Sequence, residues 1–293
     1  MFMKKLYYLN FTVLVLTVYL FPSFVFSMQG RSNITGSYIT VSYQPSMSNF
    51  RNFHIKETNF DTKDPIGLIR SARSTEPSVL KINTHFYKPQ QSDSYKSYGN
   101  DLLGFSTSIG LLVKNLRMEF EGSYKKFDIK RLVNYASRDG HRYFAIPRDT
   151  FFNNSIPYAF NAYTVAKNNG LSIISNMINL CYESIKYNNF MPYICLGAGG
   201  DFIELFDSMR IKFAYQGKLG VSYPLTSNLV LAISGQYHKV VGDKFKFLPL
   251  MLSPSTPRRR IPPQSSSEVQ DATGLLTLDL GYFSADIGLR FMF

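Results

Sequence analysis

The C-terminal stretch, residues 275–293 (LLTLDLGYFSADIGLRFMF), constrains the fold of this chain more than any other segment. From Ala285 onward, two kinds of position alternate strictly, and a period of two places successive side chains on opposite faces of a β-strand. The apolar face consists of Ala285, Ile287, Leu289, Phe291 and Phe293. The other face carries Asp286, Gly288, Arg290 and Met292. An apolar face opposite a charged one is typical of a barrel wall between lipid and a polar lumen, and a strand of a soluble sheet is the alternative.

The residues just before this alternation carry a second apolar face of the opposite parity. It consists of Leu276, Leu278 and Leu280. A change of parity within one strand requires one extra residue, so we predict a β-bulge at residues 282–284.

The N-terminal 27 residues have the pattern of a secretory signal peptide. Lys4 and Lys5 precede an apolar run that ends near Phe26, and Ser27 follows as a small residue at the expected cleavage point. An uncleaved membrane anchor is the alternative, because the run approaches the roughly 18 residues needed to span a bilayer. Pro22 and Ser23 favour cleavage. We therefore expect a signal peptide over 1–27 and an exported domain over 28–293.

No later segment resembles a spanning helix, so we expect an exported chain that enters a membrane to form a closed barrel. The composition agrees, with 25 Phe, 20 Tyr and no Trp at a mean hydropathy of only −0.10. Barrels conceal their membrane-facing residues by alternation, and aromatic residues form girdles at both interfaces. A soluble β-sandwich would also accommodate many aromatic residues.

Eight segments alternate as strands do, and the lengths of their connections alternate as well. The predicted strands are 35–43, 101–113, 116–127, 171–183, 192–202, 211–223, 229–240 and 275–293. Long connections at 44–100, 128–170 and 241–274 are interleaved with short ones, and 203–210 is intermediate. This predicts an all-β, transmembrane, antiparallel up-and-down β-barrel of about eight strands in the outer membrane, with long extracellular loops and both termini in the periplasm.

Several blocks of the sequence resemble the surface antigen family of Anaplasmataceae outer-membrane proteins. The resemblance is carried by residues 167–242, including DFIELFDSMRIKFAYQGKLGVSYPL, and by YQPS at 43–46, NDLLGFS at 100–106 and GSYKKFD at 122–128. It implies an abundant, immunodominant surface barrel, with porin activity in some members. The terminal Phe293, with apolar residues at every second position before it, looks like the motif that such barrels present to the insertion machinery. The chain departs from the family in its basic charge and in its Pro- and Arg-rich last loop.

Charged side chains fall on the face of the predicted strands that would line the lumen. They are Arg117, Glu119, Glu121, Lys125, Lys212, Lys218, Asp286 and Arg290. They could line an aqueous path, or they could form a closed, salt-bridged plug. The interior of an eight-stranded barrel is just wide enough for side chains to fill, which favours the plug.

The long connections carry much of the positive charge of a chain whose formal net charge is +12. The last of them contains Arg258, Arg259 and Arg260 between prolines, which make this part stiff and extended. A solvated charged surface is the ordinary interpretation. The sharper interpretation is attraction to acidic host-surface glycans, host proteins or anionic lipid headgroups, and a nucleic-acid partner is not expected for an exported chain.

Residues for catalysis, metal binding or cofactor binding do not form a recognisable set. His54, His85, His141 and His238 have no metal-ligand spacing, and the glycines of residues 197–200 are expected to be strand residues rather than a phosphate loop. We therefore expect no enzyme activity, metal or cofactor. The competing functions are a surface antigen with porin activity, an adhesin with a closed barrel, and a surface enzyme, for which a catalytic set is missing.

Cys181 and Cys195 are the only cysteines, and they lie in two strands joined by a short turn. Pairing about residue 188 would put them directly opposite, with both sulfurs in the lumen. An oxidising compartment favours an intrachain disulfide, and buried free thiols or an intermolecular bridge are the alternatives.

Overall fold

The computed structural model describes residues 35–76, 80, 85–86, 93–131, 135–148, 163–184, 190–252 and 272–293. The predicted signal peptide and the basic loop residues Arg258, Arg259 and Arg260 lie outside this set. Within it, no helix has the length and apolar character needed to cross a membrane.

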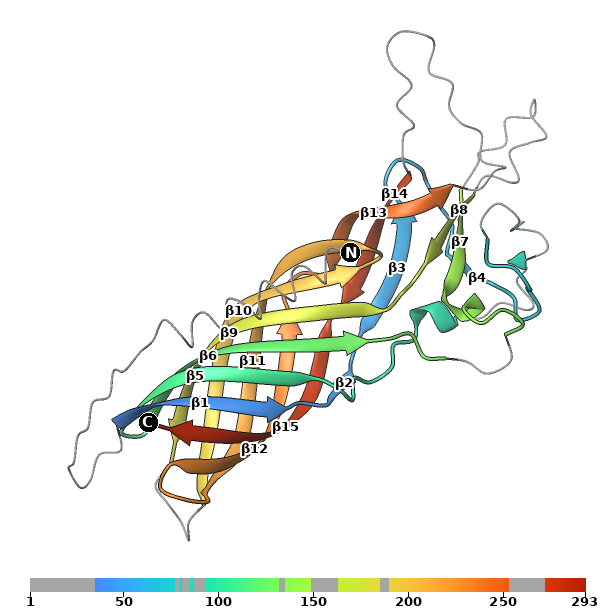
Figure 1. Cartoon of the computed structure of the whole chain (residues 1–293). Helices are drawn as coiled ribbons and strands as arrows, with labels where there is room; N and C mark the ends of the chain where they lie inside the picture. Colours follow the sequence, from blue (N-terminus) through green and yellow to red (C-terminus); the bar gives the residue numbers. More distant parts are fainter. Residues whose placement is uncertain are drawn as a thin grey trace, which may run out of the picture.

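Eight antiparallel strands close into a barrel (Figure 1). In order around the wall they are β1 (Thr35–Tyr43), β5 (Phe105–Val113), β6 (Leu116–Phe127), β9 (Leu171–Glu183), β10 (Met191–Leu205), β11 (Ser208–Pro224), β12 (Leu229–Val240) and β15 (Gly281–Met292). The pairing of β1 with β15 closes the wall. The predicted all-β up-and-down barrel of about eight strands is therefore confirmed.

The strands are staggered around this wall. Directly paired positions lead from Tyr282 on β15 through His238, Gln216, Gly197, Asn179, Glu119, Gly110 and Tyr38. The path returns to β15 at Met292, ten residues further along the same strand. Strand number and stagger together set the tilt and the diameter, and with eight strands the interior is just wide enough for side chains to fill.

One end of the barrel, called the lower end here, has short turns. Lys114 adopts φ 57° in the turn between β5 and β6. At the upper end, β10 and β11 are longer than predicted and meet in a two-residue turn at Phe206 and Asp207, whose φ values are 48° and 55°. Two successive residues with positive φ form the tight hairpin turn that suits strand twist. The intermediate connection predicted at 203–210 is therefore wrong, because the strands continue into it.

The long connections also contain regular structure, which the sequence analysis did not predict. Their strands form a second sheet in the order β3 (Arg51–Glu57), β14 (Ala272–Asp279), β13 (Lys244–Leu252), β8 (Tyr163–Lys167), β7 (Tyr143–Pro147) and β4 (Ile66–Gly67). Two short 3₁₀ helices, η2 (Ser94–Lys96) and η3 (Gly140–Arg142), accompany it. β2 (Ser46–Ser48) pairs with the upper part of β15 and leads into β3, while β12 leads into β13 and β14 into β15 (Figure 1). The upper sheet is thus partly a continuation of the barrel wall.

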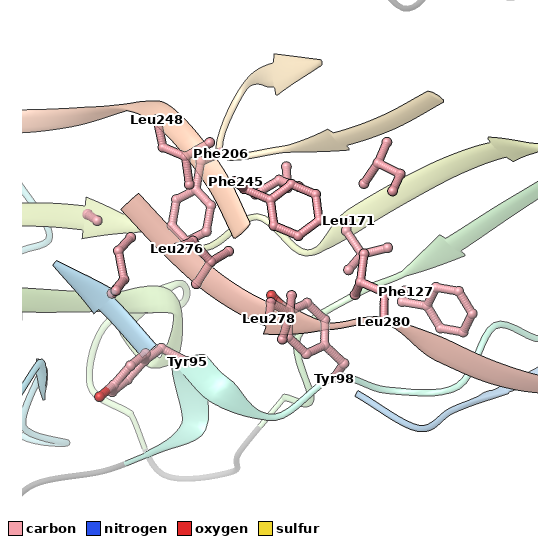
Figure 2. Close-up of a cluster of buried hydrophobic side chains, with 14 of the residues drawn as sticks. Tyr95, Tyr98, Phe127, Leu171, Phe206, Phe245, Leu248, Leu276, Leu278 and Leu280 are labelled. Atoms are coloured by element: carbon pink, nitrogen blue, oxygen red, sulfur yellow. The ribbon is translucent and has the colours of Figure 1, made fainter. Parts of the chain in front are cut away.

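An apolar core lies where the upper sheet meets the mouth of the barrel (Figure 2). Phe127 and Leu171 come from barrel strands, whereas Phe245, Leu248 and Leu276 come from the upper sheet. Aromatic contacts reinforce it, among them the stacked rings of Tyr95 and Phe144 with centroids 4.5 Å apart. This core covers the upper end of the barrel interior.

The predicted bulge at residues 282–284 is wrong. β12 and β15 pair without a register shift from Gly281 to Phe291. Leu278, Leu280 and Tyr282 are buried, as are Ser284 and Asp286 further down, so one face points inward throughout. The face changes from apolar to polar because its surroundings change, from the apolar core above to the polar lumen below.

Candidate functional site in the barrel interior

Strand alternation separates an apolar exterior from a polar interior. On β6, Leu116, Met118 and Phe120 are exposed. The same alternation buries seven of the eight charged residues expected in the lumen, namely Arg117, Glu119, Glu121, Lys125, Lys218, Asp286 and Arg290. The wall therefore presents a continuous apolar surface outside, called the lipid belt here, and opposed charges inside.

Lys212 is the exception among the predicted lumen residues. It has the inward parity of β11, but it is only half-buried. Its Nζ donates to the carbonyl of Lys244 at 2.9 Å and lies 4.9 Å from the centroid of the Phe245 ring. β11 extends past the polar lumen at this level, so Lys212 caps the edge of β13 instead of facing the lumen.

At the lower end, two arginines converge on one carboxylate. Arg117 Nη1 is 2.7 Å from Glu183 Oε2, and Arg290 Nη1 is 3.4 Å from the same oxygen. The two guanidinium groups also lie over aromatic rings, Arg117 at 4.6 Å from Tyr193 and Arg290 at 5.0 Å from Tyr38. β6, β9 and β15 are thereby joined through the lumen.

In the middle of the barrel, Glu121 is the centre of a second cluster. It accepts hydrogen bonds from Lys218 Nζ at 2.5 Å, Asn179 Nδ2 at 2.7 Å and Gln216 Nε2 at 3.0 Å. Glu119 accepts from Tyr38 Oη at 2.8 Å and from Asn179 at 3.1 Å. A buried charge is tolerated when it is paired and hydrogen-bonded, as these are.

A third cluster lies beneath the apolar core. His238 Nε2 is 2.8 Å from Asp201 Oδ2, and the imidazole stacks on Tyr282 with centroids 4.6 Å apart. Gln44 bridges the walls here, because its Nε2 donates to Gln236 at 3.0 Å and its carbonyl accepts from Lys125 Nζ at 2.7 Å.

Several members of these clusters were not in the predicted set of charged lumen residues. They are Tyr38, Gln44, Asn179, Glu183, Asp201, Gln216, Gln236 and His238. Those that lie on strands have the same inward parity as the predicted lumen residues. Assigning every polar residue of that parity to the lumen would therefore have found most of them.

Two inward glycines provide space for this network. A Cβ on Gly110 would lie 2.3 Å from the Tyr38 ring, and one on Gly197 would lie 1.9 Å from Asn179 Oδ1. Gly197 belongs to β10, as expected for a strand glycine. A missing side chain here allows a large neighbour to reach the middle of the lumen.

A cavity of about 30 Å³ remains between the lower and middle clusters. It is lined by three cations and three anions, namely Arg117, Lys218, Arg290, Glu119, Glu121 and Asp286. Several buried polar atoms of the lining have no hydrogen-bond partner among the described residues, including Thr40 Oγ1, Glu121 Oε1 and Asp286 Oδ1. A balanced, polar cavity of this size accommodates about two water molecules and no larger solute.

Cys181 and Cys195 are directly opposite in the β9–β10 pair and form a disulfide bond. Both are buried, and Arg117 Nη2 lies 3.5 Å from Cys195 Sγ. Glu119 and the two sulfurs lie close enough to share an ion. However, the disulfide removes both thiolates, so this group is not arranged to bind a metal.

At the C-terminus, Ile287, Leu289, Phe291 and Phe293 are exposed on the outer face of the barrel. Leu289 is opposite Leu231 on β12 and Val41 on β1. The four residues thus contribute one stripe of the lipid belt.

A closed barrel with an apolar exterior and a charged interior defines an outer-membrane β-barrel protein. The chain belongs to the surface antigen family, whose model matches residues 30–293. It is 25% identical over 257 residues to major surface antigen 4 of Anaplasma marginale, covering 87% of this chain and 83% of that protein.

Solved outer-membrane proteins are also similar. OprG from Pseudomonas aeruginosa has a TM-score of 0.45 at 12% identity, covering 88% of this chain and 96% of OprG. Neisserial surface protein A has a TM-score of 0.39 at 9% identity, covering 89% and 99%.

Proposed function

We propose that this protein is a closed surface-antigen barrel that presents its upper sheet outside the cell and does not conduct solutes. The observation that carries the proposal is the set of ion pairs that cross the lumen, from Arg290 to Glu183 and from Lys218 to Glu121. Above them, the apolar core covers the mouth. Surface presentation is therefore the work of the upper sheet and loops, and the barrel anchors them.

Opening this lumen would require separating buried charges. Removing one partner of a buried ion pair costs about 3–5 kcal/mol, because the remaining charge is left uncompensated. Several such pairs share partners, so a path wider than a few water molecules requires most of them to separate together. A static barrel of this kind is a poor pore.

Porin activity, which the family resemblance implies for some members, is the competing function. The test is single-channel recording of the folded protein in planar lipid bilayers. We expect no unitary current steps, whereas steps of constant amplitude in preparations of the folded monomer would overturn the closed-barrel proposal. A variant that removes one cation from the lower cluster and one from the middle cluster, Arg290→Ala with Lys218→Ala, provides the positive comparison for a leaky lumen.

The proposed orientation has the short turns in the periplasm and the upper sheet outside, because outer-membrane barrels place their long connections outside the cell. The test is epitope insertion on intact cells, with one tag at residue 258 and another in the turn at residue 227. Antibody access to the first tag alone is expected. Access to the second tag alone would reverse the orientation.

We also assign two partners beyond the lipid. The apolar C-terminal stripe ending at Phe293 engages the barrel-insertion machinery, so deletion of Phe293 should reduce insertion in cells while leaving spontaneous folding in detergent intact.

The basic loop at Arg258–Arg260 attracts acidic host-surface glycans or proteins. Loss of host-cell binding by an Arg258→Ser, Arg259→Ser and Arg260→Ser variant would support this adhesin role, and unchanged binding would contradict it. No catalytic step is part of the proposal.

A further inference from the structure

The outer face of the upper sheet continues directly from the lipid belt. Within the lipid belt, the outer face of β15 carries the exposed residues Phe283, Ile287 and Phe291. The inward parity of β14 and β15 is unbroken, so Asp279 and Thr277 lie on the same outer face further up. A residue placed on this face just above the belt therefore meets the headgroup layer of the bilayer.

The boundary itself is marked by an ion pair. Lys239, on the outer face of β12, pairs with Asp279. Lys239 is directly opposite Tyr215 on β11, an exposed residue of the belt. In the pairing of β14 with β3, Asp279 is directly opposite Arg51. The charges at this boundary thus lie on β12, β14 and β3.

Above this boundary the face is basic. Across the sheet, Lys244 is opposite Thr277, and Thr277 is opposite His54. One row higher, Leu275 is opposite Lys56, and Lys246 lies beyond Lys244 on β13. We call the exposed cations Arg51, Lys56, Lys244 and Lys246 the basic collar. Directly opposite side chains lie about 5 Å apart, so the cations of β3 and β13, which flank β14, lie about 10 Å apart across the sheet.

The collar is not neutralised by the protein. Within the described part of the chain, none of its four cations forms an ion pair. The nearby acidic residues have other partners, since Asp64 lies 3.8 Å from His54 and Asp279 is paired with Lys239. The opposite side of the barrel differs, since Lys126 at the top of β6 is 3.8 Å from Asp128. The collar cations thus differ from Lys126, which has an acidic partner.

Apolar residues adjoin the collar on its β11 side. Ile211 and Phe213 lie above the level of Tyr215 and are 69% and 80% exposed, and Phe247 is 64% exposed with φ 56°. Arg210 fixes this arrangement, because its guanidinium donates to the carbonyls of Lys246 and Phe247 at 2.7 and 3.0 Å. Cations beside exposed apolar groups match a lipid, which has a phosphate above acyl chains.

We propose that the basic collar binds the phosphate groups of anionic lipids in the leaflet that adjoins the upper end of the barrel. Continuity with the lipid belt selects a membrane lipid over a soluble partner. The headgroup layer adds about 5–8 Å beyond the hydrocarbon on each side, which covers the boundary pair and reaches the collar. Cations at such a surface attract anionic lipids, and the attraction is screened by salt. The proposal does not depend on whether the lumen conducts.

The test is native mass spectrometry of the folded chain in micelles with equal amounts of dioleoyl-phosphatidylglycerol and dioleoyl-phosphatidylcholine, which differ only in the headgroup. We expect the wild-type protein to prefer phosphatidylglycerol by about fivefold or more, the effect of roughly one surface lysine. A Lys56→Gln, Lys244→Gln, Lys246→Gln variant should lose the preference. A control with the same change of net charge, Lys126→Gln, Lys130→Gln, Lys167→Gln, should keep it.

Folding of each variant is verified by the shift in gel mobility between heated and unheated samples. An unchanged preference in the collar variant, or an equal loss in the control, would overturn the proposal. The proposal would also be overturned if the two lipids bound equally while the wild-type protein, but not the collar variant, bound a sulfated oligosaccharide. That result would identify a glycan as the partner of the collar.

Discussion

Arg290 Nη1 lies 3.4 Å from Glu183 Oε2 and connects β15 with β9, strands that are four places apart in the ring of eight. These strands are diametrically opposite, so the contact spans the full width of the lumen. Because Glu183 also binds Arg117 at 2.7 Å, one carboxylate holds together two cations from different walls.

Glu183→Gln should therefore destabilise the barrel by about 3–5 kcal/mol, since two buried guanidinium groups lose their shared counter-charge. The measurement is urea unfolding in lipid vesicles, followed by gel mobility. Combining Glu183→Gln with Arg290→Met should cost less than the sum of the single changes, because one uncompensated charge is then removed. Strict additivity would show that the two residues are not coupled.

The inward glycine Gly110 should tolerate no side chain. Its Cβ would lie 2.3 Å from the Tyr38 ring, so Gly110→Ala must displace Tyr38 and its hydrogen bond to Glu119. Overpacking of this kind costs about 1–3 kcal/mol. Gly235→Ala is the matched control, since no atom of the described residues lies within 4 Å of its added Cβ. The same unfolding assay compares them, and equal stability of the two variants would contradict the packed-lumen account.

Most barrel strands were predictable because they combine period-two alternation with a turn at one end, as in 116–127 and 171–183. The predicted strand 275–293 is instead divided between β14 of the upper sheet and β15 of the barrel. The disulfide followed from the hairpin register of Cys181 and Cys195. The upper sheet was not predicted, because its strands are short, come from three separate connections and pair over long distances. The bulge was predicted wrongly because the apolar face of Leu276 and Leu278 was taken to face lipid, whereas it faces the apolar core.

Leu289 lies on the lipid belt, with 39% of its surface exposed. Leu289→Arg should destabilise the folded barrel in vesicles by about 2–4 kcal/mol if the residue lies near the bilayer midplane. Leu289→Phe retains the apolar character and should be nearly neutral. Gly288→Ser should also destabilise the barrel, because a Cβ there would lie 2.1 Å from Ser42 Oγ and 3.0 Å from the Val41 carbonyl. An arginine tolerated as well as a phenylalanine would mean that this face does not meet lipid.

His141 should make the upper sheet sensitive to acid. His141 is 3% exposed, and its Nε2 has no hydrogen-bond partner in the part of the chain that the structure describes. Burial lowers the pKa of His141, nearby Arg142 and Arg131 lower it further, and Asp139 opposes them. The unfolded segment therefore takes up a proton more readily than the folded one, so stability is lost as the pH falls below the ordinary histidine value of about 6.5.

The expected outcome is faster local opening around η3 at pH 5 than at pH 7.5, measured by amide hydrogen exchange after correction for intrinsic rates. His141→Gln should flatten this pH dependence, because no group then titrates in the buried position. His54→Gln is the control, since His54 is half-exposed beside Asp64 and its loss should leave the difference between the two pH values intact. A pH dependence that survives in the His141 variant would assign the acid response to another group.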